Sequence, residues 1–271
     1  MVTRFDLLAG VNKDEGSTTV VGYIGVLNMS DPEAGVSIEL ASKVLELYCE
    51  MLTPLSVQLC TKFLFDTYEL DKLSNDIERG HRIGELFGEV SFNADTFRQL
   101  IEHSTGTKST YAYYFTEAKQ VNYTFLPVPS WVGEKSSHAD ELPFVFGSPY
   151  SKENSLEKVY FGDNVPADAR LWLNFFEGLT DKNKPLSDVM MRTWTNFAKS
   201  GNPNLPVPLP VGTPTWPLFN ISADTVMEFN SAELKVIATP EKDRLLNLTE
   251  TLFAARTAQV NADKAPSMFI A

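Results

Sequence analysis

Residues 5–17 read FDLLAGVNKDEGS, an apolar run that leads directly into a turn bounded by two glycines. The apolar part, residues 5–11, predicts a short buried strand. Glu15 follows just beyond the carboxyl end of that strand, where α/β sheets carry their chemistry. A carboxylate on such a turn can hold a histidine in one orientation and stabilise its charged form. On this spacing alone a solvated Lys-Asp-Glu turn is the better explanation, so a second motif is needed.

The second motif supplies a histidine 123 positions after Glu15. Residues 137–147 read SHADELPFVFG, and His138 lies in the polar part before the apolar run. A histidine on a loop suits a general base because its pKa lies near neutrality. The other two histidines, His81 and His103, fall in predicted amphipathic helices and are expected to be surface or packing residues. Taken alone, His138 is also compatible with a structural role.

The rest of the chain alternates predicted helices and strands. Residues 31–103 are predicted to be helical, about as long as an antiparallel helix pair with a bent connection. Residues 110–116, rich in aromatics and threonine, give the clearest strand. A helix is predicted over 185–199, with Pro185 at its start and Gly201 ending it. Further predicted elements are a short helix near 167–176, strands around 216–219 and 226–229, a last helix from 240 to about 260, and a frayed end over the final ten residues.

The charge balance argues against one large class of partners. The chain carries 23 Lys and Arg against 35 Asp and Glu, a net charge of −12, and no basic cluster offsets it locally. Phosphate backbones are repelled, so we expect no nucleic-acid binding. The longest apolar stretch, residues 20–27, is far shorter than the roughly 18 residues that a membrane span needs. No signal-peptide pattern follows Met1.

Cysteines and sequons bear on the cellular compartment. Cys49 and Cys60 would lie about 16 Å apart on one unbroken helix and could not pair. A bend at Pro54 would bring them together, so a disulfide stays open as the alternative to the favoured buried free thiols. Asn-x-Ser/Thr sequons are only slightly more numerous than the roughly two or three expected by chance, which gives weak support for a secretory route. They lie at Asn28, Asn122, Asn220 and Asn247.

Three segments together are similar to the type B carboxylesterase/cholinesterase family. Residues 10–17 (GVNKDEGS) resemble the acid-bearing loop of that family, and residues 137–147 resemble its histidine segment. Residues 194–204 (WTNFAKSGNPN), followed by WPLF at 216–219, resemble its C-terminal signature. The segments occur in the order of the family and span most of the chain. The resemblance implies an α/β-hydrolase fold.

The same resemblance implies roles for individual residues. Glu15 corresponds to the triad acid, His138 to the triad base, and Glu141 to a carboxylate that supports the histidine. The implied substrate is a small-molecule carboxylic ester, without a cofactor or metal, and the implied location is secreted or cell-surface. Thr18 and Thr19 stand where cholinesterases carry aromatics that bind a quaternary ammonium. This difference argues for a general carboxylic ester hydrolase lineage.

The nucleophile of the family is missing from these 271 residues. The family places its serine in a Gly-x-Ser-x-Gly elbow, and the chain contains neither this pattern nor the preceding Gly-Gly oxyanion loop. The match begins near the midpoint of the family, so we expect residues 1–271 to be a single partial domain: a fragment, a truncated product or a piece that needs a partner. Such a chain is expected to be inactive alone and to expose an apolar sheet edge with unpaired backbone groups.

Functions from different classes stay open. The first is a segment of a carboxylic ester hydrolase that uses a Ser–Glu–His triad. The second is the non-catalytic, neuroligin-like adhesion branch of the same fold, with a protein partner. The intact KDEGS at 13–17 favours the enzyme branch, because the acid is retained there. A folded remnant without a function of its own is a third interpretation of the chain as it stands.

Overall fold

The computed structural model describes residues 4–27, 29–52, 56–120, 128–150 and 179–264. The chain divides into two compact units, which are described separately. The first, called the sheet unit, comprises residues 1–15, 99–128 and 133–240. The second, called the helical unit, comprises residues 16–98, 129–132 and 241–271.

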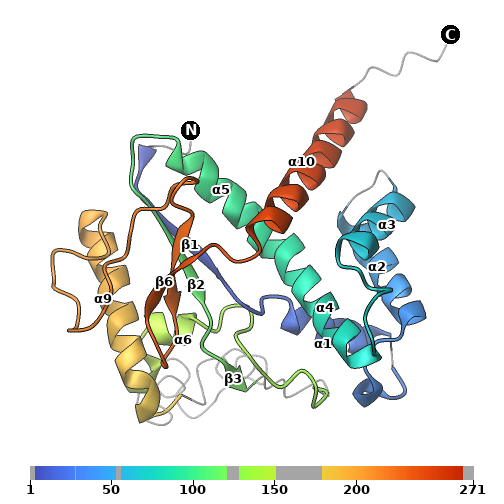
Figure 1. Ribbon diagram of the computed structural model, residues 1–271, viewed down its shortest axis with the longest axis horizontal. Coiled ribbons are helices and arrows are strands. Elements are labelled where there is room, and N and C mark those ends of the chain that lie inside the picture. The colour runs from blue at the N-terminus through green and yellow to red at the C-terminus, as the bar shows by residue number, and fades with distance from the viewer. Residues whose placement is uncertain (1–3, 28, 53–55, 121–127, 151–178, 265–271) are drawn as a thin grey trace, which may run out of the picture. The chain divides into compact units, whose positions relative to one another are not determined.

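A mixed four-stranded sheet underlies the sheet unit (Figure 1). Its strands lie in the order β1-β2-β5-β6, with β1, β2 and β5 parallel and β6 antiparallel to β5. The predicted strands at 5–11, 110–116 and 226–229 are confirmed apart from one or two residues at their ends. The strands are β1 Leu7–Asn12, β2 Thr110–Phe115, β5 Thr225–Phe229 and β6 Lys235–Ala238, and a separate antiparallel pair consists of β3 Lys119–Gln120 and β4 Glu134–Lys135.

Helix α9, Lys184–Ser200, confirms the helix predicted over 185–199. Pro185 lies in its first turn, where the missing N–H has no partner to lose. Gly201 ends the helix in the left-handed region, with φ 72°, which glycine adopts without a steric penalty. The other helical segments of this part of the chain are α6 Leu142–Val145, η4 Ser148–Tyr150 and η6 Asp181–Asn183.

Aromatic side chains from the sheet and from α9 dominate the core of the sheet unit. The Trp216 ring, 1% exposed, lies 5.6 Å from the Trp194 ring and 5.2 Å from the Phe229 ring. Its indole Nε1 donates a hydrogen bond to the carbonyl oxygen of Ala112 at 3.0 Å, so the polar end of the ring is satisfied. The buried cluster comprises Tyr111, Phe115, Phe144, Leu186, Val189, Met190, Trp216, Met227 and Phe229.

The strand predicted around 216–219 is wrong, and a side chain is the reason. The backbone N–H of Trp216 donates to Asn204 Oδ1 at 2.8 Å, and its carbonyl accepts from Asn204 Nδ2 at 3.0 Å. Pro217 has no N–H to offer a neighbouring strand. Asn204 therefore takes the backbone groups that a strand partner would need. Strand β6, at the edge of the sheet, has no counterpart among the predicted elements.

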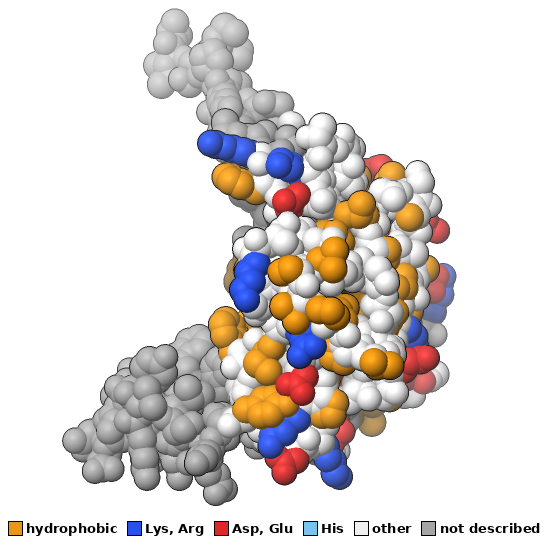
Figure 2. All heavy atoms as spheres, turned by 90° about the vertical axis from the view of Figure 1, so that its left-hand side faces the viewer, with side chains coloured by type: hydrophobic (Ala, Val, Ile, Leu, Met, Phe, Trp, Pro, Cys, Tyr) orange, Lys and Arg blue, Asp and Glu red, His pale blue; other side chains and the backbone are white. Residues whose placement is uncertain are grey.

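A second asparagine anchors the proline-rich segment that follows α9. Asn196, 1% exposed, donates from Nδ2 to the carbonyls of Pro203 and Val207 at 3.1 and 2.8 Å, and its Oδ1 accepts from the Val207 N–H at 3.1 Å. The segment exposes Leu205 and Val211. Figure 2, which views the side that carries α9, shows hydrophobic side chains interspersed with charged ones. The asparagines of the C-terminal signature thus fix a loop.

Residues 31–103 form more elements than the predicted helix pair. Two capped starts account for extra breaks: Ser56 Oγ accepts from the Leu59 N–H at 3.3 Å, and Asn75 Oδ1 accepts from the Glu78 N–H at 2.9 Å. The elements are η2 Pro32–Ala34, α2 Ile38–Leu52, α3 Val57–Thr67, α4 Asp76–Gly88, the π-helical turn η3 Glu89–Asn93 and α5 Ala94–Ser104. Helices α1 Ser17–Val26 and α10 Lys242–Lys264 also belong to the helical unit, whereas residues 99–104 of α5 belong to the sheet unit. Helix α10 confirms the predicted last helix.

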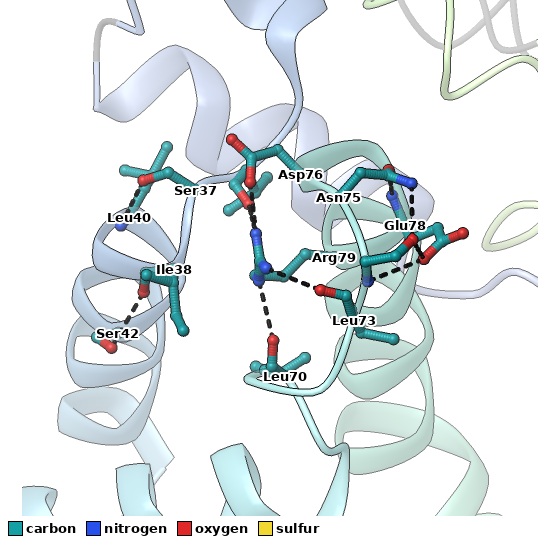
Figure 3. A network of polar contacts seen from close by, with 12 residues as sticks. Ser37, Ile38, Leu40, Ser42, Leu70, Leu73, Asn75, Asp76, Glu78 and Arg79 are labelled. Atoms are coloured by element: carbon teal, nitrogen blue, oxygen red, sulfur yellow. Dashed lines mark hydrogen bonds and ion pairs between the residues drawn. The ribbon is translucent and has the colours of Figure 1, made fainter.

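A buried arginine fixes the connection between α3 and α4 (Figure 3). Arg79 is 6% exposed, and its guanidinium donates to the carbonyl oxygens of Leu70 and Val36 at 2.9 and 3.0 Å. It also pairs with the Asp76 carboxylate at 2.6 Å. A buried charge is costly unless it is paired and hydrogen-bonded. These contacts meet that requirement and hold the connecting loop in place.

Cys49 and Cys60 form a disulfide, so the favoured prediction of free thiols is wrong. Helix α2 ends at Leu52 and α3 begins at Val57, so the helix breaks between the two cysteines. Their Cα atoms lie 5.9 Å apart as a result. The bend considered at Pro54 falls in 53–55, outside the described residues.

Other predictions also fall outside the described residues. The short helix near 167–176 lies in 151–178, and most of the final ten residues lie beyond Lys264. In the described part of the chain, no helix is long and apolar enough to cross a membrane.

Replacing both cysteines by serine is expected to lower the free energy of unfolding by about 3 kcal/mol, because the bond closes a short loop in the unfolded chain. The two residues are 11 positions apart in the sequence. Urea unfolding of the oxidised wild type and of the Cys49→Ser/Cys60→Ser variant measures the difference. The wild type in reductant should approach the variant. Equal stability of all three samples would show that the bond contributes nothing.

Candidate active site

The loop that carries Glu15 is fixed by the end of the sheet. Asn12, the last residue of β1, lies in register with Phe115, the last residue of β2. Backbone contacts continue beyond the strand: the Lys13 N–H donates to the Phe115 carbonyl and the Asp14 N–H to the Ser136 carbonyl, both at 2.9 Å. The chain then turns, and the Glu15 residue is 6% exposed.

The loop that carries His138 is attached to the same place. Ser136 Oγ donates to the Phe115 carbonyl at 2.8 Å. One residue later, the Ser137 N–H donates to Asp140 Oδ2 at 2.8 Å. Ala139, directly after the histidine, has a φ of +68°, which is uncommon for a residue with a Cβ. This tight turn leads into α6.

Glu15 and His138 meet at hydrogen-bond distance. His138 Nδ1 lies 2.7 Å from Glu15 Oε2, and the Nδ1–H donates because a carboxylate can only accept. The other oxygen, Glu15 Oε1, accepts from the backbone N–H of Asn12 at 2.7 Å. The Glu15 side chain is 7% exposed and that of His138 is 49% exposed. A buried carboxylate thus orients an imidazole that solvent can reach.

The surroundings favour the charged form of the imidazole. The pKa of His138 is raised from its usual value near 6.5, first because of the hydrogen bond to Glu15. Partial burial opposes the shift, while the negative charges of Glu15, Glu141 and Asp140 add to it. A ring in this environment accepts a proton more readily than a free histidine does.

Glu141 reaches the pair through Asn12. Its Oε2 accepts from Asn12 Nδ2 at 2.7 Å, and its Oε1 lies 3.5 Å from the Tyr113 hydroxyl, at the long limit of a hydrogen bond. Burial raises the pKa of the Glu141 carboxyl, and the hydrogen bond from Asn12 opposes this shift.

A Cβ at Gly10 would overlap the Tyr113 ring, so only glycine lets the tyrosine lie across β1.

The residue after the acid is a glycine for a reason within the helical unit. A Cβ at Gly16 would overlap the backbone of α4 at Gly84 and Gly88. The start of α1 can therefore approach α4 closely only without a side chain at this position.

Of the four predicted glycosylation sites, Asn220 and Asn247 lie within the described residues. Asn220 is exposed, and its Oδ1 accepts from the Ser222 and Ala223 N–H groups at 3.0 and 2.7 Å. Asn247 is exposed on α10. Asn28 and Asn122 lie outside the described residues. Among the described residues, no group of three or more His, Cys, Asp or Glu is placed to hold a metal ion.

Sequence reasoning missed Asn12, which contacts the acid, Glu141 and the loop of the histidine. The available signal was an amide that ends an apolar run, and this signal alone does not distinguish a site residue from a turn residue.

Comparisons with known proteins identify the family of the chain. A model of the carboxylesterase family matches residues 2–246. Neuroligin-3 of Mus musculus is 29% identical over 210 residues, 76% of this chain and 22% of that protein. Carboxylesterase 3B of Mus musculus is 29% identical over 191 residues, 70% of this chain and 28% of that protein. Carboxylesterase 5A of Felis catus is 34% identical over 139 residues, 51% of this chain and 20% of that protein.

The chain therefore spans between a fifth and a little more than a quarter of the length of these relatives. The family match includes residues of both units, and the mixed sheet of the sheet unit, which packs against residues of α9, agrees with an α/β fold. The fold expected from the sequence is thus confirmed, and the chain belongs to the carboxylesterase family.

Proposed function

We propose that this chain supplies the acid and the general base of a serine esterase site that hydrolyses carboxylic esters. The observation that carries the proposal is the 2.7 Å hydrogen bond between Glu15 Oε2 and His138 Nδ1. Glu15 fixes the ring so that Nε2 is the nitrogen that takes the proton from a serine hydroxyl. The order of acid before histidine in the chain also agrees with α/β-hydrolases.

The nucleophile has to come from residues other than these 271. No Gly-x-Ser-x-Gly occurs in the sequence, and Ser137, next to the histidine, is itself 3% exposed. We propose that the complete site forms when an upstream part of a longer protein adds the serine and the oxyanion donors. We further propose that both units belong to one domain, since the family match runs from residue 2 to 246.

The same proposal includes a secreted or cell-surface location. A disulfide persists in oxidising compartments, and Cys49 and Cys60 form one. Asn220 and Asn247 are exposed and could carry glycans there, as sequons do in secreted proteins. The substrate would be a small carboxylic ester.

A second candidate is a non-catalytic, neuroligin-like role with a protein partner. The support for this candidate is the share of the chain that aligns with each relative. Neuroligin-3 aligns with 76% of the chain, carboxylesterase 3B with 70% and carboxylesterase 5A with 51%. The paired acid and histidine favour the esterase proposal, because a binding protein has no need of a general base.

The proposal predicts that the full-length protein containing this chain hydrolyses p-nitrophenyl acetate and reacts with a fluorophosphonate probe. Replacing Glu15 or His138 by glutamine should lower kcat/KM by roughly 10³- to 10⁶-fold, because the members of a triad act as a unit. The matched control is His81→Gln, which replaces an exposed histidine of the helical unit and should leave the rate unchanged. A full-length protein that neither hydrolyses the ester nor labels would support the second candidate.

The raised pKa of His138 predicts a pH-dependent contribution to stability. The folded state holds the proton more tightly than the unfolded state, so the contribution is full below about pH 6.5 and is lost as pH rises through the folded pKa. In urea unfolding, the stability gap between wild type and Glu15→Gln should therefore be larger near pH 6 than near pH 9. Glu228→Gln, which removes a carboxylate bonded to Thr116 Oγ1, should show a constant gap. A gap for Glu15→Gln that does not change with pH would contradict the charged pair.

A further inference from the structure

Asn12 contacts both halves of the acid–histidine pair. Its backbone N–H donates to Glu15 Oε1 at 2.7 Å, and its side-chain Nδ2 donates to the Ser137 carbonyl at 2.6 Å. That carbonyl belongs to the peptide bond that leads into His138. Nδ2 also donates to Glu141 Oε2 at 2.7 Å. One residue, with no exposed surface, thus holds both the turn of the acid and the peptide of the ring.

We propose that Asn12 is a positioning residue, whose neutral amide sets the separation of Glu15 and His138. This inference rests on the acid–histidine assignment proposed above and deepens it. Asn12 touches no reacting atom in this scheme and acts through the two residues that it holds.

The orientation of the amide follows from its partners. A backbone carbonyl and a carboxylate can only accept, so Nδ2 rather than Oδ1 faces Ser137 and Glu141. Asn12 Oδ1 is buried, and it has no hydrogen-bond partner among the described residues. An unpaired buried acceptor is costly. The amide is therefore retained for its two donors, both of which point at the site.

The charge of the surroundings explains why the residue must be neutral. Glu15 from the turn and Glu141 at the start of α6 accept hydrogen bonds from Asn12 on two sides. Asp140, from the same loop as His138, adds negative charge near the ring, and the Tyr113 hydroxyl from β2 lies 3.5 Å from Glu141 Oε1. Asp14, in the turn of the acid, accepts from the Ser136 N–H at 3.1 Å. An aspartate at position 12 would add a negative charge beside two carboxylates and would remove both side-chain donors.

The test uses proton NMR of the 271-residue chain, which contains three histidines. The low-field Nδ1–H resonance and the Cε1–H titration of His138 are assigned with His138→Gln. In Asn12→Asp, nearly equal in size to wild type, the Nδ1–H resonance should disappear because the hydrogen bond to Glu15 is lost. The titration midpoint should fall, because that hydrogen bond is the largest cause of the raised pKa and its loss outweighs the added negative charge. Asn12→Ala, which adds no charge, should do the same.

A matched control lies in the same unit. Asn230 also donates from Nδ2 to a backbone carbonyl, that of Thr116 at 3.0 Å, so Asn230→Asp makes the same chemical change at a residue that bonds Thr116 and not the loop of His138. It should leave the resonance and the midpoint as in wild type. This control separates positioning of the pair from a general effect of placing an acid in the sheet unit.

Other outcomes decide against the proposal. A higher midpoint with the resonance retained in Asn12→Asp would mean that only charge matters at this position. No change in either variant would also overturn it, and loss of the fold in both would mean that Asn12 serves the architecture alone. The Glu15→Gln variant distinguishes failure of this inference from failure of the proposed function. If the Nδ1–H resonance is unchanged in Glu15→Gln, the acid–histidine pair itself is refuted. If the resonance is lost in Glu15→Gln but retained in both Asn12 variants, only the positioning role is refuted.

Discussion

The carbonyl oxygen of Phe115, at the end of β2, accepts hydrogen bonds from both loops that form the site. The Lys13 N–H, just after β1, donates to it at 2.9 Å, and Ser136 Oγ donates at 2.8 Å. Phe115 is fully buried and lies in register with Asn12. Because one fixed oxygen anchors both loops, the parallel pairing of β1 with β2 determines how the carboxylate meets the imidazole. All these contacts lie within the sheet unit.

The sequence is most informative where structure depends on local pattern. Strands β1 and β2 follow from apolar and aromatic runs, and α9 from the proline and glycine at its ends. The pairing of Glu15 with His138 is expected only through the resemblance of three segments to one family. The sequence is least informative where one side chain replaces a backbone partner, as Asn204 does for Trp216. The disulfide is not the favoured prediction, and the role of Asn12 is not predicted, for the same reason. Each depends on contacts between residues that the spacing of apolar residues along the sequence does not reveal.

The carboxylates around His138 have different tasks because they have different donors. Asp140 accepts from the Ser137 N–H at 2.8 Å, and Glu141 accepts from Asn12 at 2.7 Å. Glu15 takes the ring itself. All three charges favour the imidazolium, yet only the hydrogen bond to Glu15 also fixes the tautomer. Glu15 thus supplies both charge and orientation, whereas Asp140 and Glu141 contribute negative charge alone.

A second histidine of the sheet unit shows what a purely structural role requires. His103 is 1% exposed, and both ring nitrogens are hydrogen-bonded, Nδ1 to Thr110 Oγ1 at 2.7 Å and Nε2 to the Phe5 carbonyl at 2.9 Å. The buried ring of His103 thus links Phe5, just before β1, to Thr110, the first residue of β2. His138 instead gives Nδ1 to a buried carboxylate and keeps half of its side-chain surface exposed. A histidine held only for stability gains nothing from that exposure, whereas a general base has to be reached by the group whose proton it takes.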